Sequence, residues 1–219
     1  MNETYIPRWL DRAKPFLGVG AAVGTVYLIV VVGFGAAPRT TDVGYSPVQP
    51  VEFSHALHAG QYGMDCRFCH TTVEGAAHAA VPPTATCMNC HTTMAADEVR
   101  GKKLKLVRES YQTGRSLPWV RVHDLPDYVF FDHSAHVARG VGCVSCHGRV
   151  DQMERVWQHE TLSMAWCLDC HRNPERHLRP KGSVTKHDWE PDEDPEQLGR
   201  RLRQEYRINP STDCSTCHR

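Results

Sequence analysis

The pentapeptide Cys-x-x-Cys-His occurs five times in this chain and uses all ten of its cysteines. The copies begin at Cys66, Cys87, Cys143, Cys167 and Cys214. This pentapeptide is the attachment site of c-type haem, in which the two thiols form thioethers to the porphyrin and the adjacent imidazole binds the iron. The repeated motif therefore predicts five covalently bound haems, and no other feature constrains the fold as much.

Two groups of residues follow from the motif. The predicted thioether residues are Cys66, Cys69, Cys87, Cys90, Cys143, Cys146, Cys167, Cys170, Cys214 and Cys217, and the predicted proximal iron ligands are His70, His91, His147, His171 and His218. Disulfide bonds would not require a histidine after every second cysteine. Zinc sites would consume the Cys-x-x-Cys units in pairs and leave one of the five over. Both alternatives therefore fit the pattern less well than haem.

An uncharged stretch of 22 residues, 16–37, precedes all of the motifs. As a helix it would be roughly 33 Å long, which is enough to cross a hydrocarbon core of about 30 Å. The apolar region of a cleaved signal peptide is typically about 7–15 residues long. The sequence therefore favours a retained transmembrane anchor over a signal peptide.

The charges before this stretch predict its orientation. Arg8, Arg12 and Lys14 outnumber Glu3 and Asp11. Positive residues remain on the cytoplasmic side of a membrane span. We therefore expect a single-pass protein of the bacterial inner membrane, with a cytoplasmic N-terminus over residues 1–15 and its motifs on the periplasmic side.

Residues 38–219 have the length of a single domain but contain few long apolar runs. Such a segment cannot bury enough apolar surface by itself. We therefore predict a multihaem cytochrome c fold that is mostly α-helical, with short helices, extensive loops and a core filled by porphyrin. The net charge of zero gives no footprint for nucleic acid.

An internal repeat divides this domain. Phe-x-His-x-x-His occurs at residues 53–58 and again at 131–136, each time shortly before a Cys-x-x-Cys-His motif. Each copy is followed by a second haem motif a little over twenty residues later. The sequence predicts two dihaem units, residues 51–91 and 129–171, a connector over 92–128 and a C-terminal segment over 172–219 that holds the fifth haem.

The connector contains one predicted helix, residues 95–113. Leu104, Val107 and Tyr111 would share its inner face, and Gly114 would end it.

The repeated histidines are the strongest candidates for the second, distal ligands of the irons. Nine histidines lie outside the five motifs. Residues three apart share one face of a helical turn, so His55 with His58, and His133 with His136, can each reach two neighbouring irons.

The fifth distal ligand is less well defined by the pattern. His123 is the first choice, and the alternatives are His78, His159, His177, His187 and the thioether of Met164. A methionine ligand would raise the haem potential, although packing against a porphyrin is the more ordinary role for this side chain. An iron with two protein ligands has no open position for substrate, which favours electron transfer over catalysis.

The repeated motif resembles the small multihaem cytochromes of the c3 and c7 type. In those proteins the first histidine of such a pair serves the next haem in the sequence, and the second serves a later one. The resemblance implies that His55 faces the haem of His70 and that His133 faces the haem of His147.

A wider resemblance is carried by residues 81–91, 122–136 and 164–172, together with the predicted anchor and the five motifs. In these features the chain is similar to the pentahaem cytochrome subunit of bacterial alternative complex III. That family implies a multisubunit quinol oxidoreductase of respiration or photosynthesis. Its partners would be an iron–sulfur protein, integral membrane quinol-binding subunits and a monohaem cytochrome c. This subunit would relay electrons from the iron–sulfur protein towards the monohaem cytochrome or a soluble acceptor, without a substrate site of its own.

Three other functions compete with this one. NapC/NirT-type quinol dehydrogenases also carry one helix and four or five haems, but they often have a methionine where this chain has Thr72, and here the first motif begins 28 residues after the span. A multihaem enzyme would keep one iron open, in some cases with a Cys-x-x-Cys-Lys motif that this sequence lacks. A free periplasmic electron shuttle would not need the apolar stretch.

Overall fold

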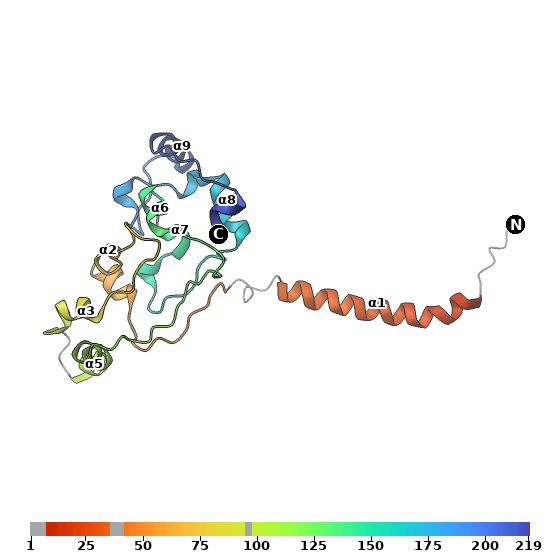
Figure 1. Cartoon of the computed structure of the whole chain (residues 1–219), viewed down its shortest axis with the longest axis horizontal. Helices are drawn as coiled ribbons and strands as arrows, with labels where there is room; N and C mark the ends of the chain where they lie inside the picture. Colours follow the sequence, from red (N-terminus) through yellow and green to blue (C-terminus); the bar gives the residue numbers. More distant parts are fainter. Residues whose placement is uncertain (1–7, 36–41, 95–97) are drawn as a thin grey trace. The chain divides into compact units, whose positions relative to one another are not determined.

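The computed structural model describes residues 8–35, 42–94 and 98–219. These residues fall into two compact units, one ending at Asp42 and one running from Val43 to Arg219. The first unit is the helix α1, and the second holds all of the haem motifs (Figure 1).

Helix α1 runs from Arg8 to Gly35. Its segment Trp9–Gly35 has a mean hydropathy of 2.2, with none of its most apolar window buried against the rest of the chain. The hydroxyl of Thr25 donates to the carbonyl of Ala21 at 2.9 Å, so this polar group is satisfied within the helix. The helix is long and apolar enough to cross a membrane. A signal sequence near an N-terminus can have the same length and composition. Residues 36 and 37 of the predicted span lie outside the described residues.

The second unit is built from short helices joined by long loops. The helices are η2 (Ala56–Gln61), α2 (Cys66–Cys69), α3 (Thr84–His91), α4 (Glu98–Lys103), α5 (Lys105–Thr113), α6 (His133–Ala138), α7 (Val144–His147), η3 (Val150–Gln152), α8 (Met164–Arg172), η4 (Pro174–His177), η5 (Lys181–Ser183), α9 (Pro195–Glu205) and α10 (Cys214–Cys217). Over the described residues the β structure is a single bridge between Val141 and Leu178. The prediction of a mostly helical, loop-rich fold is confirmed.

Polar side chains cap three of the helices that carry or face the haem motifs, namely α2, α6 and α8. Asp65 accepts a hydrogen bond from the backbone of Arg67 at the start of α2, and Ser163 accepts one from Trp166 at the start of α8. Asp132 does the same for α6. A cap of this kind contributes about 1 kcal/mol. Because isolated helices this short are unstable in water, these caps stabilise the starts of α2, α6 and α8.

The protein core is small and lies to one side of this unit. Its cluster of buried residues is Leu178, Leu198, Leu202 and Ile208, with Val141, Trp189 and Tyr206 packed against it. This cluster lies where α9 packs on η4, far from α3 and α5 (Figure 1). No large side chain among the described residues is fully buried. The polypeptide alone therefore provides only a minor part of the core that a domain of this size needs.

The connector differs from its prediction in two respects. The predicted helix over 95–113 is two helices, α4 and α5, with Leu104 at the break, while residues 95–97 lie outside the described part of the chain. The buried face of α5 carries Val107 and Ser110, whereas Tyr111 is 53% exposed. The reason is that Ser110 bonds to Thr84 of α3 and to the carbonyl of Arg115. The predicted stop is confirmed, because Gly114 has a left-handed φ of 69°.

We predict that Gly199→Ala destabilises this unit. A Cβ at position 199 would collide with the backbone carbonyl of Glu175, which cannot rotate away. Overpacking costs roughly 1–3 kcal/mol, whereas the better helix propensity of alanine returns at most about 1 kcal/mol. Denaturant unfolding should show a net loss of stability. Gly182→Ala is the matched control, since nothing lies within 4 Å of its Cβ position. Equal stability of both variants would contradict the prediction.

Candidate haem-binding sites

Each Cys-x-x-Cys-His motif forms one short helical turn, and we number these motifs 1 to 5 in chain order. The backbone amide of the histidine donates to the carbonyl of the first cysteine in motif 1 (His70 to Cys66, 2.9 Å), in motif 3 (His147 to Cys143, 3.0 Å) and in motif 5 (His218 to Cys214, 2.9 Å). Residues three apart lie on one face of such a turn. Both thiols of a motif can therefore reach the same edge of a porphyrin.

Three motif histidines face a second histidine from elsewhere in the chain. The ring centroids are 6.1 Å apart for His58 and His91, 6.3 Å for His133 and His147, and 6.2 Å for His136 and His171. Two imidazoles that bind one metal ion from opposite sides, with bonds of about 2 Å, place their centroids roughly 6 Å apart. The spacing of all three pairs thus fits one iron between them.

The two copies of Phe-x-His-x-x-His adopt the same geometry. The Phe53 ring lies edge-on to His55 at 4.8 Å and stacks on His58 at 4.4 Å. In the second copy, the Phe131 ring lies edge-on to His133 at 4.8 Å and stacks on His136 at 4.6 Å. The phenylalanine thus holds both imidazoles of the turn at fixed angles, which explains its place in the repeat.

His55 belongs to the environment of motif 1. Burial, together with electrostatic interactions with His70, His58 and His187, lowers its pKa to about 4. His55 is therefore neutral at neutral pH, the form in which an imidazole binds a metal.

Main-chain carbonyls select the ring nitrogen that each histidine presents. The Nδ1 atoms of six histidines lie 2.7–3.2 Å from a carbonyl oxygen; the pairs are His58 with Ser54, His70 with Ala80, His133 with Ala77, His136 with Asp132, His171 with Ser211 and His218 with Tyr128. An Nδ1–H that donates to a carbonyl leaves the Nε2 lone pair free, which is the usual arrangement of a histidine that binds a metal. The Nδ1 atoms of His55 and His91 are buried without a partner.

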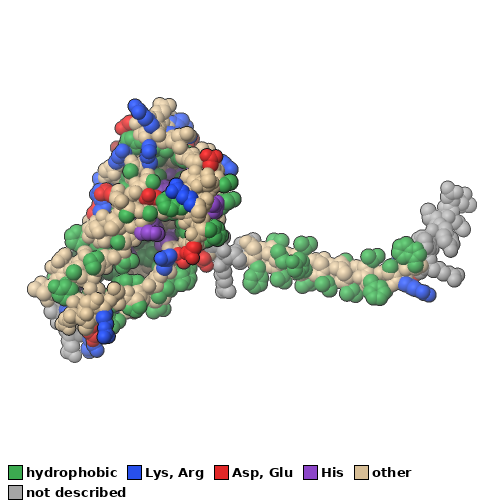
Figure 2. Space-filling model, viewed as in Figure 1, with side chains coloured by type: hydrophobic (Ala, Val, Ile, Leu, Met, Phe, Trp, Pro, Cys, Tyr) green, Lys and Arg blue, Asp and Glu red, His purple; other side chains and the backbone are tan. Residues whose placement is uncertain are grey.

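Taken with the thiol pairs, these contacts fit c-type haem. Histidine side chains are visible in the hollow on the face of the domain in Figure 2. The residues that would hold haem are the motif cysteines and histidines together with His55, His58, His133 and His136.

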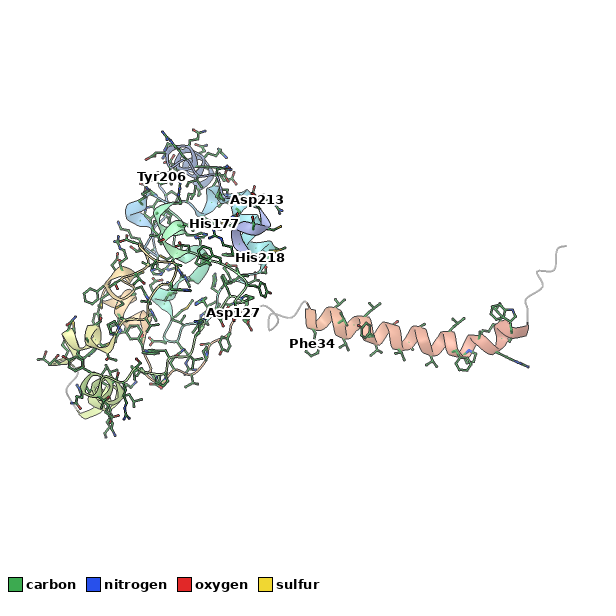
Figure 3. All side chains as sticks on the ribbon, viewed as in Figure 1. Phe34, Asp127, His177, Tyr206, Asp213 and His218 are labelled. Carbon is green, nitrogen blue, oxygen red and sulfur yellow. The ribbon has the colours of Figure 1, made fainter. Side chains whose placement is uncertain are left out.

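Motif 5 differs from the others. His218 is exposed at the edge of the domain (Figure 3), and the ring in contact with it, at 5.8 Å, is that of Tyr128. Over the described residues, no histidine ring is in contact with His218.

His123, the first choice for the fifth distal ligand, lies elsewhere. Its Nε2 is 3.3 Å from Nδ1 of His147, and the ring centroids are 4.4 Å apart. It thus contacts the Nδ1 side of the His147 ring, the side away from Nε2.

The other candidates for the fifth ligand are dispersed. His159 forms an ion-pair contact with Glu160 at 3.7 Å, His187 lies near His55, and His177 is half-buried beside Gly142. His78 is exposed, and so is Met164, whose side chain has 66% of its surface in contact with solvent. None of these contacts selects one of them over the others.

The motifs are adjacent in an order that differs from their order in the sequence. The Cys66 thiol of motif 1 and the Cys143 thiol of motif 3 interact, and both residues contact the loop at Val184 and Thr185. Cys69 interacts electrostatically with Cys87 of motif 2. Motif 1 therefore lies between motifs 2 and 3.

Motif 4 in turn lies between motifs 3 and 5. Cys146 of motif 3 interacts with Cys170, and Cys167 interacts with Cys217 of motif 5. Main-chain contacts agree, since Nδ1 of His171 meets the carbonyl of Ser211 just before motif 5. Over the described residues the adjacent motifs thus run 2–1–3–4–5. Figure 1 shows the first four motifs of this row as α3, α2, α7 and α8 crossing the domain.

Comparisons with known proteins agree with this geometry. Residues 35–113 match the class III cytochrome c family, and residues 129–219 match the family of cytochrome c7 and related cytochromes c. The multihaem cytochrome c subunit of menaquinone reductase from Nitratidesulfovibrio vulgaris is 30% identical over 179 residues, which cover 73% of this chain and 84% of that protein. The chain belongs to the multihaem c-type cytochromes. This cytochrome therefore carries covalently bound haem, and each of the two family matches contains one of its two repeated units.

Proposed function

We propose that this cytochrome binds five haems, one at each motif, and relays electrons along them. The thioether bonds would come from the ten motif cysteines, and the proximal ligands would be His70, His91, His147, His171 and His218. The distal ligands would be His55 for motif 1, His58 for motif 2, His133 for motif 3 and His136 for motif 4. A haem iron with two protein ligands takes up and releases single electrons with little rearrangement.

The row of adjacent motifs is the observation that carries this proposal. Every motif has a neighbour close enough for their cysteines or histidines to interact, so that no haem would be isolated from the rest. The turn η2 carries the histidines for motifs 1 and 2, and α6 carries those for motifs 3 and 4. Each turn would therefore hold two irons at a fixed separation. Motifs 2 and 5 would be the ends of the row, where electrons enter and leave.

We further propose that the cytochrome is a subunit of a membrane-bound complex that exchanges electrons with the quinone pool. The relative from Nitratidesulfovibrio vulgaris carries the name of a menaquinone reductase subunit. The resemblance to alternative complex III supports the same kind of assembly, with an iron–sulfur protein, integral quinol-binding subunits and a monohaem cytochrome as partners. The name of this relative and the resemblance imply opposite directions of electron flow, towards the quinone in the first case and away from quinol in the second.

Helix α1 would anchor this subunit, with its N-terminus in the cytoplasm and the haem domain on the periplasmic side. The excess of positive charge before the apolar segment supports that orientation. An added protease should therefore cleave the N-terminal residues in inverted vesicles, which expose the cytoplasmic face of the membrane. It should leave them intact in sealed spheroplasts, which expose the periplasmic face.

The primary test is the haem content of the purified protein. We expect about five iron atoms and five haems per chain, measured by elemental analysis and by the pyridine haemochrome spectrum. The haem should stay with the polypeptide on a denaturing gel, because thioether bonds survive denaturation. Four or fewer haems in protein from a host with full haem-attachment machinery would contradict the assignment.

The complex is tested by purification in mild detergent. Co-purification with iron–sulfur and quinone-reactive subunits supports the proposal. Reduction of its haems by menaquinol or oxidation by menaquinone then gives the direction of flow. An isolated subunit that itself oxidises quinol would instead support a NapC/NirT-type dehydrogenase.

A further inference from the structure

His147 is the exception among the histidines whose Nδ1 partner is defined. In six others the partner is a main-chain carbonyl, which can only accept a hydrogen bond. In His147 the partner is the Nε2 atom of a second imidazole, His123, at 3.3 Å. The two rings are nearly perpendicular, with an interplanar angle of 82°.

The direction of this hydrogen bond follows from the role of His147. The inference rests on the proposed function, in which Nε2 of His147 binds iron. Nδ1 then carries the hydrogen and donates it, so Nε2 of His123 must accept with its lone pair. The nitrogen that a distal ligand would normally use is thus already occupied.

The loop around His123 is held in place from outside. Gln49 binds the backbone of Val120 in both directions: its side-chain nitrogen donates to the Val120 carbonyl at 2.8 Å, and its oxygen accepts from the Val120 amide at 2.9 Å. Arg121 and Asp124 form an ion pair at 2.6 Å across His123. The chain therefore fixes this loop although it contains no regular secondary structure.

We propose that His123 is a positioning residue for motif 3: it accepts the Nδ1–H of His147, fixes the tautomer and orientation of that ring, and increases its basicity towards iron. An acceptor on Nδ1 makes the imidazole a stronger donor to the metal. A stronger donor favours the oxidised iron and lowers the reduction potential of that haem. The interior haem beside His147 would therefore be tuned by a side chain rather than by a carbonyl.

The test compares two substitutions in the full-length protein. His123→Leu removes the acceptor, whereas His123→Gln retains an oxygen that can accept near the same position. We expect the leucine variant to show a higher midpoint potential for one haem, with the other four potentials unchanged. The equilibrium constant for reduction of that haem should increase by on the order of tenfold. The glutamine variant should restore most of the shift. Potentials are measured by spectroelectrochemical titration, and haem content by the pyridine haemochrome.

A second variant keeps the inference testable if His123→Leu does not accumulate. Gln49→Ala leaves both imidazoles intact but releases the loop, and should move the same potential upwards by less. Assignment uses His133→Met, which alters the haem facing His147 and must change that same potential. Unchanged potentials in every variant with five haems would overturn the inference. A new high-spin haem that binds carbon monoxide in His123→Leu would also overturn it, by making His123 an axial ligand. Loss of haem stoichiometry in the parent protein would instead refute the proposed function.

Discussion

Replacing His136 with alanine is expected to convert one six-coordinate haem into a high-spin haem that binds carbon monoxide. The His136 ring lies 6.2 Å from that of His171, and its Nδ1 is held at 2.7 Å by the Asp132 carbonyl. Removing it leaves the iron of motif 4 with an open position. Motifs 2, 3 and 4 have a facing histidine ring, and His55 is the histidine proposed for motif 1, so at most one haem in five should bind carbon monoxide in the parent protein. The variant should add one more.

Two further variants separate loss of the ligand from a general disturbance. Ser134→Ala lies on the same turn and removes a hydrogen bond to Asp132 but no imidazole. Its carbon monoxide binding should match that of the parent. His136→Met should keep six ligands and raise the potential of one haem, because methionine is the weaker donor to iron(III). Carbon monoxide binding by two or more haems of the parent protein would contradict the pairing and favour a catalytic site.

Much of the domain was predictable because its chemistry is local. Cys-x-x-Cys-His defines a turn by itself, and Phe-x-His-x-x-His defines a second turn that presents two imidazoles on one face. The structure places His133 opposite His147, as the resemblance to the c3 and c7 cytochromes implies. Whether these residues ligate iron stays a prediction, since the ring spacing supports it without testing it.

The order of the motifs could not be predicted because distant contacts determine it. Cys66 lies 3.7 Å from the carbonyl of Thr185, and the amide of Cys143 donates to the neighbouring carbonyl of Val184 at 3.1 Å. Asp65 also accepts from the hydroxyl of Thr185. The loop at Val184 and Thr185 thus joins motif 1 to motif 3, and no local pattern in the sequence predicts that contact.

The position of His123 beside motif 3 could not be predicted for a similar reason. A histidine in an irregular loop is a natural candidate for an iron ligand when the number of irons exceeds the number of assigned ligands. Its actual neighbour, Nδ1 of His147, lies 24 residues away. The signal that could have indicated the loop's position was Gln49, but its reciprocal bonds with Val120 span 71 residues.

The structural order 2–1–3–4–5 and the sequence order of the motifs predict opposite results for one pair of variants. His55 and His58 lie on one turn and face motifs 1 and 2, respectively, so His55→Met and His58→Met are a matched pair. Each should raise the potential of one haem. In the structural order the haem of motif 1 has a haem on either side of it in the row, whereas in sequence order it would be the first haem of the row. The converse holds for motif 2.

We therefore expect His55→Met to slow electron exchange between the haem of motif 2 and the remaining three, because an electron must leave the raised potential of motif 1 to pass. The slowing should be roughly tenfold for every 60 mV of the shift. His58→Met should leave exchange among the haems of motifs 1, 3, 4 and 5 at the parent rate. Two-dimensional exchange NMR of haem methyl resonances in partially reduced protein gives these rates. The opposite outcome, with the block in His58→Met, would mean that motif 2 is interior and that the thiol contact between Cys66 and Cys143 does not lie on the path.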